Sequence, residues 1–336
     1  MVLRMRMKRT PLYLIAFLAV SFSLGLASHT NAQFIFTTFD DPSGVNSFGN
    51  NSTMAYGISG NNIVGFYSSP SGENYGFLYN GSNFTTLSVP LSIATQAFGI
   101  SGNSIVGDYR PSNTSQYSGF LYNGTTYATV SDPLATQGTF AYGISGNDVV
   151  GTYMNATGNH GYIYNGSTYV TLNDPLASQG ADKGTFAAGI SGNNIVGYYT
   201  DAQGNTHGFL FNGSTYTTIN DPLALNGAIG TEVTGISGNN IVGLYQDSSG
   251  LFHGFLYNGT TYTNVDDPAG SPTGVHGVTG VDGNNLVGFY LSPTGWNGFE
   301  ATPDVPEPSS LTLLALGLCG VGLVRVLRVK PVSVKR

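Results

Sequence analysis

Positive charge is scarce in this chain, and nearly all of it lies at the two ends. Of the eleven Lys and Arg residues, only Arg110 and Lys183 lie between residues 34 and 304. The same stretch carries seventeen Asp and Glu residues, which gives it a net charge of −15. Nucleic-acid binding depends on clustered cations that displace counterions. We therefore expect no nucleic-acid partner, and acidic polysaccharide is disfavoured as a direct ligand unless divalent cations bridge the two.

Other absences weigh against an enzyme. Cys319 is the single cysteine, so no disulfide can form within one chain. A sialidase-like site needs several arginines, and residues 34–304 contain only Arg110. No HExxH motif or Ser/His/Asp order is present. We expect no catalytic residues. A glycosidase that uses the two loop carboxylates Asp201 and Asp247 is the remaining enzymatic alternative.

The N-terminal residues have the pattern of a secretory leader. Arg4, Arg6, Lys8 and Arg9 precede an apolar run at 12–26. The small residue Ala32 then provides a cleavage point, so the mature chain begins near Gln33. Residues 1–32 are therefore assigned to a signal peptide, and the protein is expected to be exported.

The C-terminal residues have a second targeting pattern. Val305, Pro306, Glu307 and Pro308 precede an apolar run at 311–324, and five cations follow it. The run is short for a transmembrane helix, which takes about 20 residues, and the cations would hold the C-terminus in the cytoplasm.

This order resembles a PEP-CTERM sorting signal, and we assign it to residues 305–336. The resemblance implies that a membrane-embedded exosortase processes the tail near the Pro-Glu-Pro motif. The inner membrane would then hold the chain only transiently, before its release to the cell surface or extracellular matrix. A permanent C-terminal anchor is the alternative.

Between the two ends, one sequence unit recurs six times. The segment GISGNNIVGFY begins at Gly57 and returns at spacings of 42 to 46 residues. Later copies begin at Gly99, Gly143, Gly189, Gly235 and Gly280. A second element such as GFLYNGSNFTTL follows, and its Asn80-Gly81 pair predicts a two-residue hairpin. β-branched and aromatic residues fill the unit without helical periodicity. Four short strands in about 45 residues are typical of one β-propeller blade.

The two ends of the repeat region complement each other. The sixth copy stops after Ala301, without a fourth strand, and residues 34–44 match 261–270. We therefore predict an all-β, six-bladed β-propeller of four-stranded blades over residues 33–304, whose N-terminal strand completes the last blade and removes exposed sheet edges. The repeat also resembles the HAF family of probable extracellular repeats, which implies an extracellular propeller-like module.

Loop variation predicts which end of such a ring binds partners. The turns between first and second strands and between third and fourth strands are short and uniform. The remaining loops vary in length and content, and repeat proteins vary where they bind. The candidate residues on that face are Asp132, Asp174, Asp201, Asp221, Asp247, Asp267 and Trp296. Trp296 either stacks on a sugar or is buried at the seam of the ring.

Recurring polar residues have structural explanations that we weigh beside ligation. An Asp precedes Pro in five units, as at Asp41, and an Asx turn explains it. Calcium binding through neighbouring loop oxygens is the alternative, and no other cofactor is expected. His160, His207 and His253 recur at one repeat position, too far apart in a ring to share a zinc ion. The glycine at Gly65 and its equivalents indicates a bulge or a close backbone approach.

These observations predict an exported, exosortase-sorted surface or extracellular-matrix protein. It would act as a structural or binding component of an exopolysaccharide biofilm, with the exosortase and an exopolysaccharide as partners. A glycan-binding, lectin-like propeller is the alternative, followed by a secreted carbohydrate-active enzyme.

Overall fold

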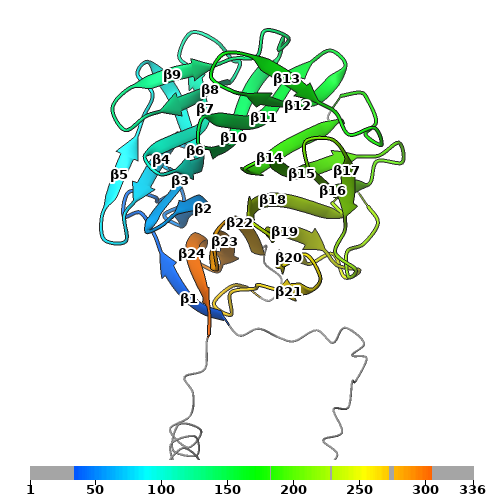
Figure 1. Ribbon diagram of the computed structural model, residues 1–336. Coiled ribbons are helices and arrows are strands. Elements are labelled where there is room, and N and C mark those ends of the chain that lie inside the picture. The colour runs from blue at the N-terminus through cyan, green and yellow to red at the C-terminus, as the bar shows by residue number, and fades with distance from the viewer. Residues whose placement is uncertain (1–33, 182, 228, 272–275, 305–336) are drawn as a thin grey trace, which may run out of the picture.

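A computed structural model describes residues 34–181, 183–227, 229–271 and 276–304. The predicted signal peptide, the motif Val305–Pro308 and the apolar segment 311–324 lie outside them. Those described residues form 24 β-strands arranged in a ring (Figure 1). A membrane-spanning helix is absent from this part of the chain.

Four antiparallel four-stranded sheets make up most of the ring. The first comprises β6 (Ser92–Ser101), β7 (Ser104–Pro111), β8 (Ser118–Tyr122) and β9 (Tyr127–Val130). The second comprises β10 (Gly138–Ser145), β11 (Asp148–Asn155), β12 (Gly158–Tyr164) and β13 (Tyr169–Leu172). The third comprises β14 (Thr185–Ser191), β15 (Asn194–Thr200), β16 (Thr206–Phe211) and β17 (Tyr216–Ile219). The fourth comprises β18 (Thr231–Ser237), β19 (Asn240–Gln246), β20 (Phe252–Tyr257) and β21 (Tyr262–Asn264).

The remaining strands form one eight-stranded sheet that contains two antiparallel four-stranded units. One unit comprises β2 (Asn51–Ser59), β3 (Asn62–Ser68), β4 (Asn74–Tyr79) and β5 (Phe84–Leu87). The other comprises β22 (His276–Asp282), β23 (Asn285–Ser292), β24 (Gly295–Pro303) and β1 (Phe34–Phe39). A short parallel pairing joins β2 to β24 through Asn51 and Ser52. The predicted propeller of four-stranded blades is thus present, but the first and last units are not separate sheets as the prediction had them, because β2 extends far enough to reach β24.

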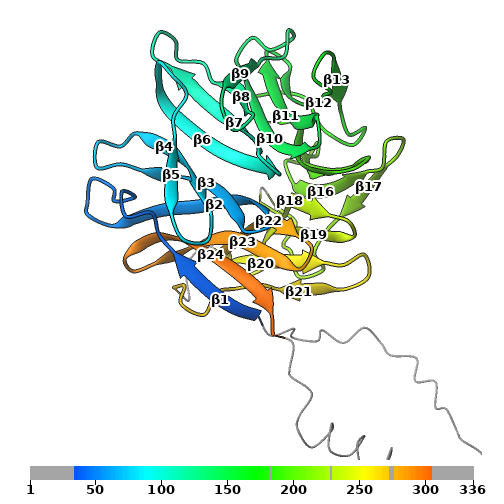
Figure 2. The same cartoon turned by 60° about the vertical axis from the view of Figure 1, so that its left-hand side comes forward.

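The N-terminal strand β1 pairs antiparallel with β24 along its whole length, from Phe34 opposite Pro303 to Phe39 opposite Gly298. Figure 2 shows the two strands side by side at the outer edge of their unit. Phe36 contacts Phe299 with ring centroids 5.5 Å apart. The last unit therefore combines the two ends of the described chain.

Turn chemistry differs from the prediction in one respect. Asn80 and Gly81 are part of a four-residue connection, because Tyr79 pairs with Phe84 across it. The Asn80 Oδ1 accepts the N–H groups of Ser82 and Asn83, at 3.1 and 2.8 Å, and so stabilises the longer loop. The two-residue turns are instead those between first and second strands, such as the one in which Gly60 has φ +59°.

The hydrophobic core lies between neighbouring units. Val64 and Leu87 of the first unit pack with Ala97 and Phe120 of the next, and all four are buried. This arrangement buries both faces of inner strands such as β3, whereas outer strands such as β5 stay partly exposed. Burial of this apolar surface is the main source of stability in such folds.

The glycine in each second strand is required by close packing. A Cβ on Gly65 would lie 2.0 Å from the carbonyl oxygen of Met54 and 2.7 Å from the Phe77 ring. The pairing register shifts here, between Ala55 and Gly57, as in a β-bulge. The close backbone approach predicted at Gly65 is confirmed, whereas the bulge lies opposite it, in β2.

Candidate functional site

The variable loops gather at one end of the ring, which we call the variable face. It consists of the loops between second and third strands and those that follow each fourth strand. The described ranges are 40–50, 69–73, 88–91, 112–117, 131–137, 156–157, 173–181, 183–184, 201–205, 220–227, 229–230, 247–251, 265–271 and 293–294.

Four of the predicted aspartates lie in these loops but point into the protein. Asp132, Asp174, Asp221 and Asp267 are only 2–3% exposed. In each, Oδ1 accepts the N–H of the residue two positions later at 2.8 Å, which is the expected Asx turn. These aspartates lie in the loops where the sequence predicted them. Because they are buried, they stabilise the loop conformation and do not present carboxylates to solvent.

Burial also changes the acidity of these turn residues. It raises the pKa of Asp132, Asp174 and Asp267, although the loop N–H groups partly offset the effect. Within the described residues, no group of three His, Cys, Asp or Glu side chains is arranged to hold a metal ion. Calcium binding by loop oxygens stays a prediction.

The recurring histidines each connect a loop of the variable face to the end of a fourth strand. In His160, Nε2 lies 2.8 Å from the Thr157 hydroxyl and Nδ1 lies 3.0 Å from Oδ1 of Asn173. In the next unit, Nε2 of His207 lies 3.1 Å from Oδ2 of Asp201, and Asn220 donates to Nδ1 at 3.0 Å. Each histidine has its own partners within one unit, as the structural explanation predicts.

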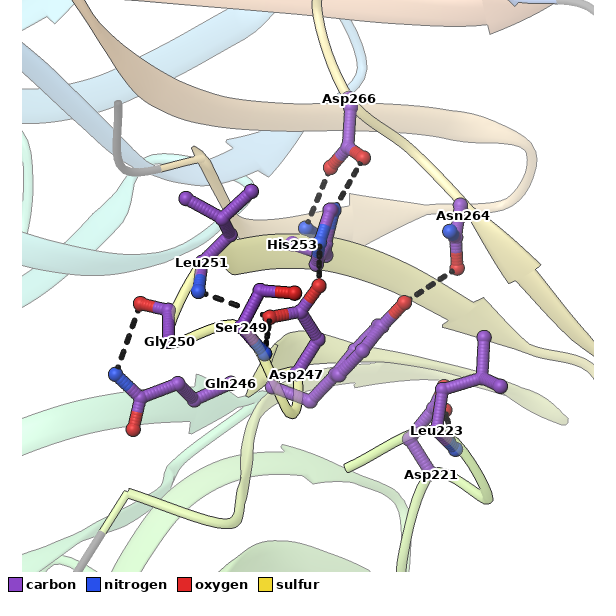
Figure 3. Close-up of polar contacts among 12 residues, drawn as sticks. Asp221, Leu223, Gln246, Asp247, Ser249, Gly250, Leu251, His253, Asn264 and Asp266 are labelled. Carbon is purple, nitrogen blue, oxygen red and sulfur yellow. Dashed lines mark hydrogen bonds and ion pairs between the residues drawn. The ribbon is translucent and has the colours of Figure 1, made fainter. Parts of the chain in front are cut away.

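His253 differs from the other two because it lies between two carboxylates. Its Nδ1 is 2.7 Å from Oδ2 of Asp266, and its Nε2 is 3.3 Å from Oδ2 of Asp247 (Figure 3). Burial lowers the pKa of His253, but the contacts with Asp266 and Asp247 outweigh it and raise the pKa overall. Stacking on Tyr245, with ring centroids 5.1 Å apart, fixes the imidazole plane.

The two loop carboxylates of the glycosidase alternative both have lowered pKa values. Burial would raise the pKa of Asp201, but hydrogen bonds from Asn205, His207 and Gln203 outweigh it and lower the pKa to about 2. The Leu251 N–H is the main cause of the lowered pKa of Asp247. A glycosidase needs one carboxyl with a raised pKa as its general acid. Neither residue of this pair has that property.

Trp296 lies at the seam of the ring. The sequence placed it in a loop, but the structure places it in β24, since the preceding loop ends at Thr294. It pairs with Ser52 of β2, and its ring packs edge-on against Phe289 at 5.5 Å. Trp296 therefore lies at the seam, where one of the two alternatives placed it, but it is only partly buried. Stacking of its ring on a sugar stays a prediction.

The structure also contains a site that our sequence analysis missed, an axial cavity of about 360 Å³ between the innermost strands. We call it the axial cavity throughout. It is lined by Tyr56, Phe98, Tyr142, Phe186, Ala188, Tyr198, Glu232, Thr234, Leu244, Thr279 and Phe289. Figure 1 shows the strands that supply these residues around the centre of the ring.

The cavity is lopsided because one repeat position changes size around the ring. The residue before the repeat glycine is aromatic in three consecutive units (Tyr56, Phe98 and Tyr142) and small in the other three. The rings of Phe98 and Tyr56 lie 4.9 Å apart, and those of Phe98 and Tyr142 lie 5.3 Å apart. Ala188, Thr234 and Thr279 face them and leave the space open. This change from AYGI and AFGI to AAGI, VTGI and VTGV was the signal available in the sequence.

Two acidic side chains lie in or beside this aromatic environment. Burial raises the pKa of Glu232, which lines the cavity. Burial also raises the pKa of Asp108 well above its usual range, and its Oδ1 has no hydrogen-bond partner among the described residues. Burial and the charge of Asp108 together raise the pKa of the Tyr56 and Tyr142 hydroxyls. The centre of the ring is therefore an apolar environment with an excess of carboxyl groups.

Along the axis of the ring, the axial cavity lies nearer to the variable face than to the opposite face. Glu232 precedes Thr234 by two residues on β18, and β18 ends at the opposite turn, next to Gly238. A second cavity of about 70 Å³, lined by residues such as Gly57 and Ile58, lies beyond the layer that contains Tyr56.

Comparisons with known proteins identify the tail and the fold. Residues 304–328 match the family model described as the PEP-CTERM protein-sorting motif, which begins one residue after β24 ends. A search of curated protein sequences found no match. The chain is thus a β-propeller followed by a PEP-CTERM sorting motif.

Solved structures with a similar fold share little sequence. A mutant of AofleA from Arthrobotrys oligospora is 10% identical, with a TM-score of 0.50, over 81% of this chain and 87% of that one. The six-bladed β-propeller lectin of Aleuria aurantia, described with a fucose recognition mode, is 14% identical, with a TM-score of 0.43, over 77% of this chain and 97% of that one. The β-propeller domain of the Trilobed protease from Pyrococcus furiosus is 12% identical, with a TM-score of 0.41, over 62% and 66% of the two chains. At these identities the likeness concerns the fold alone.

Proposed function

We propose that this protein is exported, sorted by an exosortase, and placed at the cell surface or in the extracellular matrix as a structural or binding component of an exopolysaccharide biofilm. The observation that carries the proposal is the sorting motif at 304–328, which follows the last strand of the ring without a linker. A PEP-CTERM motif implies an exported substrate of a membrane-embedded exosortase. The inner membrane would hold the tail before cleavage near Pro308.

The variable face provides surface for a matrix partner. Four consecutive units expose a leucine in the loop after their fourth strand, from 49% to 86% exposed. These are Leu91, Leu134, Leu176 and Leu223. Exposed apolar side chains that recur on one face favour an interaction role over an inert scaffold. Leu91 adopts φ +63°, an unfavourable conformation for a residue with a side chain, which shows that its loop is held in shape.

Processing and location are tested together in the native host. Cell fractions are probed by immunodetection, and the protein is analysed by intact mass. We expect a matrix form that begins near Gln33 and ends close to Pro308. Replacement of Pro306, Glu307 and Pro308 by Ala should retain the chain in the membrane, whereas Ala at Ser309 and Ser310 should not. A wild-type product that keeps residues 311–336 in the membrane would identify the tail as a permanent anchor and remove the main support for a matrix role.

A lectin-like propeller is the second candidate, favoured by the predicted binding role of the variable face. It requires saturable affinity for a defined sugar. Glycan-array screening, followed by titration of Leu134→Asp and Leu176→Asp variants, separates this function from a structural one. Binding that is lost in these variants supports the lectin, whereas the absence of any saturable glycan ligand supports a structural component.

A further inference from the structure

The axial cavity combines three properties that are unusual for the inside of a structural ring. Six aromatic side chains line it, a carboxylate reaches it, and the residues facing the aromatic side are small. Its volume of about 360 Å³ is within the usual range for small-ligand pockets, roughly 300–1,000 Å³.

Glu232 is the ionisable group that the cavity leaves without a protein partner. It makes no hydrogen bond or ion pair with any residue that the structure describes, whereas the hydroxyls of Thr234 and Thr279 donate to backbone carbonyls. The hydroxyl hydrogen of each threonine is therefore used elsewhere, and only the acceptor side of the oxygen is left for a ligand. Neither Arg110 nor Lys183, the two cationic residues of the ring, lines the cavity.

An unpaired carboxylate in an apolar cavity is best compensated by a positive charge. Aromatic faces attract organic cations through their quadrupole, most strongly where water is excluded. A calcium or magnesium ion would instead need six or more oxygen ligands, which this lining does not supply. The chemistry of the lining therefore matches an ammonium group with its attached carbon atoms.

We propose that the axial cavity binds a small organic ammonium ion. The aromatic side chains of Tyr56, Phe98 and Tyr142 would hold it on one side, and the carboxylate of Glu232 on the other. This binding site goes beyond the proposed matrix function and does not depend on where the protein is located.

The repeats themselves provide substitutions that the fold accepts. Gln96 occupies in the second unit the position that Glu232 occupies in the fifth, so Glu232→Gln introduces a residue already used there. Tyr142 occupies the position of Ala188, so Ala188→Tyr fills the cavity with a side chain that a neighbouring unit carries. Glu73→Gln, in a loop of the variable face, is a control that makes the same chemical change outside the cavity.

The test is calorimetric titration of the chain, as isolated from its host, with choline and with glucosamine. We expect one saturable site for at least one of them. Its neutral counterpart, 3,3-dimethyl-1-butanol for choline or glucose for glucosamine, should bind at least tenfold more weakly. Glu232→Gln should weaken binding at least tenfold, Ala188→Tyr should abolish it, and Glu73→Gln should leave it unchanged.

The pattern of ligands identifies the type of ammonium group. Binding of choline alone indicates a quaternary ammonium, and binding of glucosamine alone indicates an amino sugar. The proposal is overturned if neither binds, if the neutral counterparts bind equally well, if Ala188→Tyr binds as the wild type does, or if sodium competes as effectively as the ammonium ions. Since the titration uses isolated protein, its failure leaves the fractionation result for the proposed function unaffected.

Discussion

At the scale of single residues, equivalent positions in different units carry side chains of different charge. Asn173, Asn220 and Asp266 occupy the same position at the end of the fourth strand, and each contacts the histidine of its unit. Only the third is charged. A single exchange of amide for carboxylate therefore gives His253 an electrostatic environment that His207 lacks.

Asp266→Asn should convert the surroundings of His253 into those of His207. In the wild type the folded-state pKa of His253 is raised above its usual 6.5. Its stabilising contribution is thus complete below pH 6.5 and is lost as the pH rises through the folded-state pKa. We expect the variant to titrate at lower pH in NMR spectra of the imidazole and to lose about 1 kcal/mol of stability at pH 5.5. An unchanged His253 titration would show that Asp266 does not determine its pKa.

Asp108→Asn should stabilise the protein at neutral pH. Burial raises the folded-state pKa of Asp108 above its usual value of 3.8, so ionisation costs more in the folded than in the unfolded state. Stability therefore falls as the pH rises above 3.8. We expect the variant to be more stable by about 1 kcal/mol in urea denaturation at pH 7.5 and close to the wild type at pH 4.

The control for this prediction is Asp148→Asn, because asparagine stands at the equivalent position in other units, such as Asn62 and Asn194. It makes the same exchange at the start of β11 and should leave the free energy of unfolding unchanged at both pH values. A destabilised Asp108→Asn variant at pH 7.5 would mean that the carboxylate has a partner that the amide cannot replace.

At the scale of strands and sheets, the repeat pattern contains most of the information about the fold. The recurring glycine, the turn before the second strand and the missing fourth strand of the last unit predict the four-stranded units and the role of β1. The four-residue turn after Tyr79 was missed because Asn-Gly is also typical of two-residue hairpins, and only the Asn80 side chain distinguishes the two.

The site was less predictable than the sheets. The Asp-Pro pairs predict turns and their location, but burial of Asp132 and Asp267 depends on packing between units that the local sequence does not show. To predict the axial cavity from the sequence, one would have to align the six units and compare the residue that each carries before the repeat glycine. Tyr56 and Ala188 are ordinary strand residues by themselves, and only the ring places them opposite one another.

Gly197→Ala should destabilise the protein severely. A Cβ at this position would lie 1.9 Å from the carbonyl oxygen of Phe186 and 3.0 Å from the ring of Phe209. The first and second strands of the unit would have to separate, and we expect a loss of about 3 kcal/mol or more in chemical denaturation. Gly227→Ala, with no atom within 4 Å of its Cβ, is the matched control and should be nearly neutral. Equal effects of the two would contradict the close approach in the second strand.

At the scale of the whole molecule, β1 closes the ring. It supplies the fourth strand of the last unit and covers β24, which would otherwise be an unpaired edge. Phe39 packs on Tyr79 of the first unit, with ring centroids 5.1 Å apart, so β1 also fastens the last unit to the first.

Deletion of residues 34–39 should lower the unfolding midpoint and cause self-association that depends on protein concentration, since β24 would then offer a free edge. Light scattering after gel filtration and chemical denaturation measure the two effects. Ile35→Thr is the control, because this side chain is 56% exposed and contributes little to the contact with β24. A monomeric deletion variant with wild-type stability would show that closure by β1 is dispensable.

The pairing of β1 with β24 also has a consequence for how the protein is made. During synthesis Phe34 leaves the ribosome before any other part of the ring, and Pro303, opposite it, leaves last. The first strand must therefore wait, without its partner, while all the intervening units are translated. The sorting motif at 304–328 follows Pro303 directly, so a product truncated before β24 lacks both the strand that β1 pairs with and the signal. A molecule that carries the complete motif therefore also carries every strand needed to close the ring.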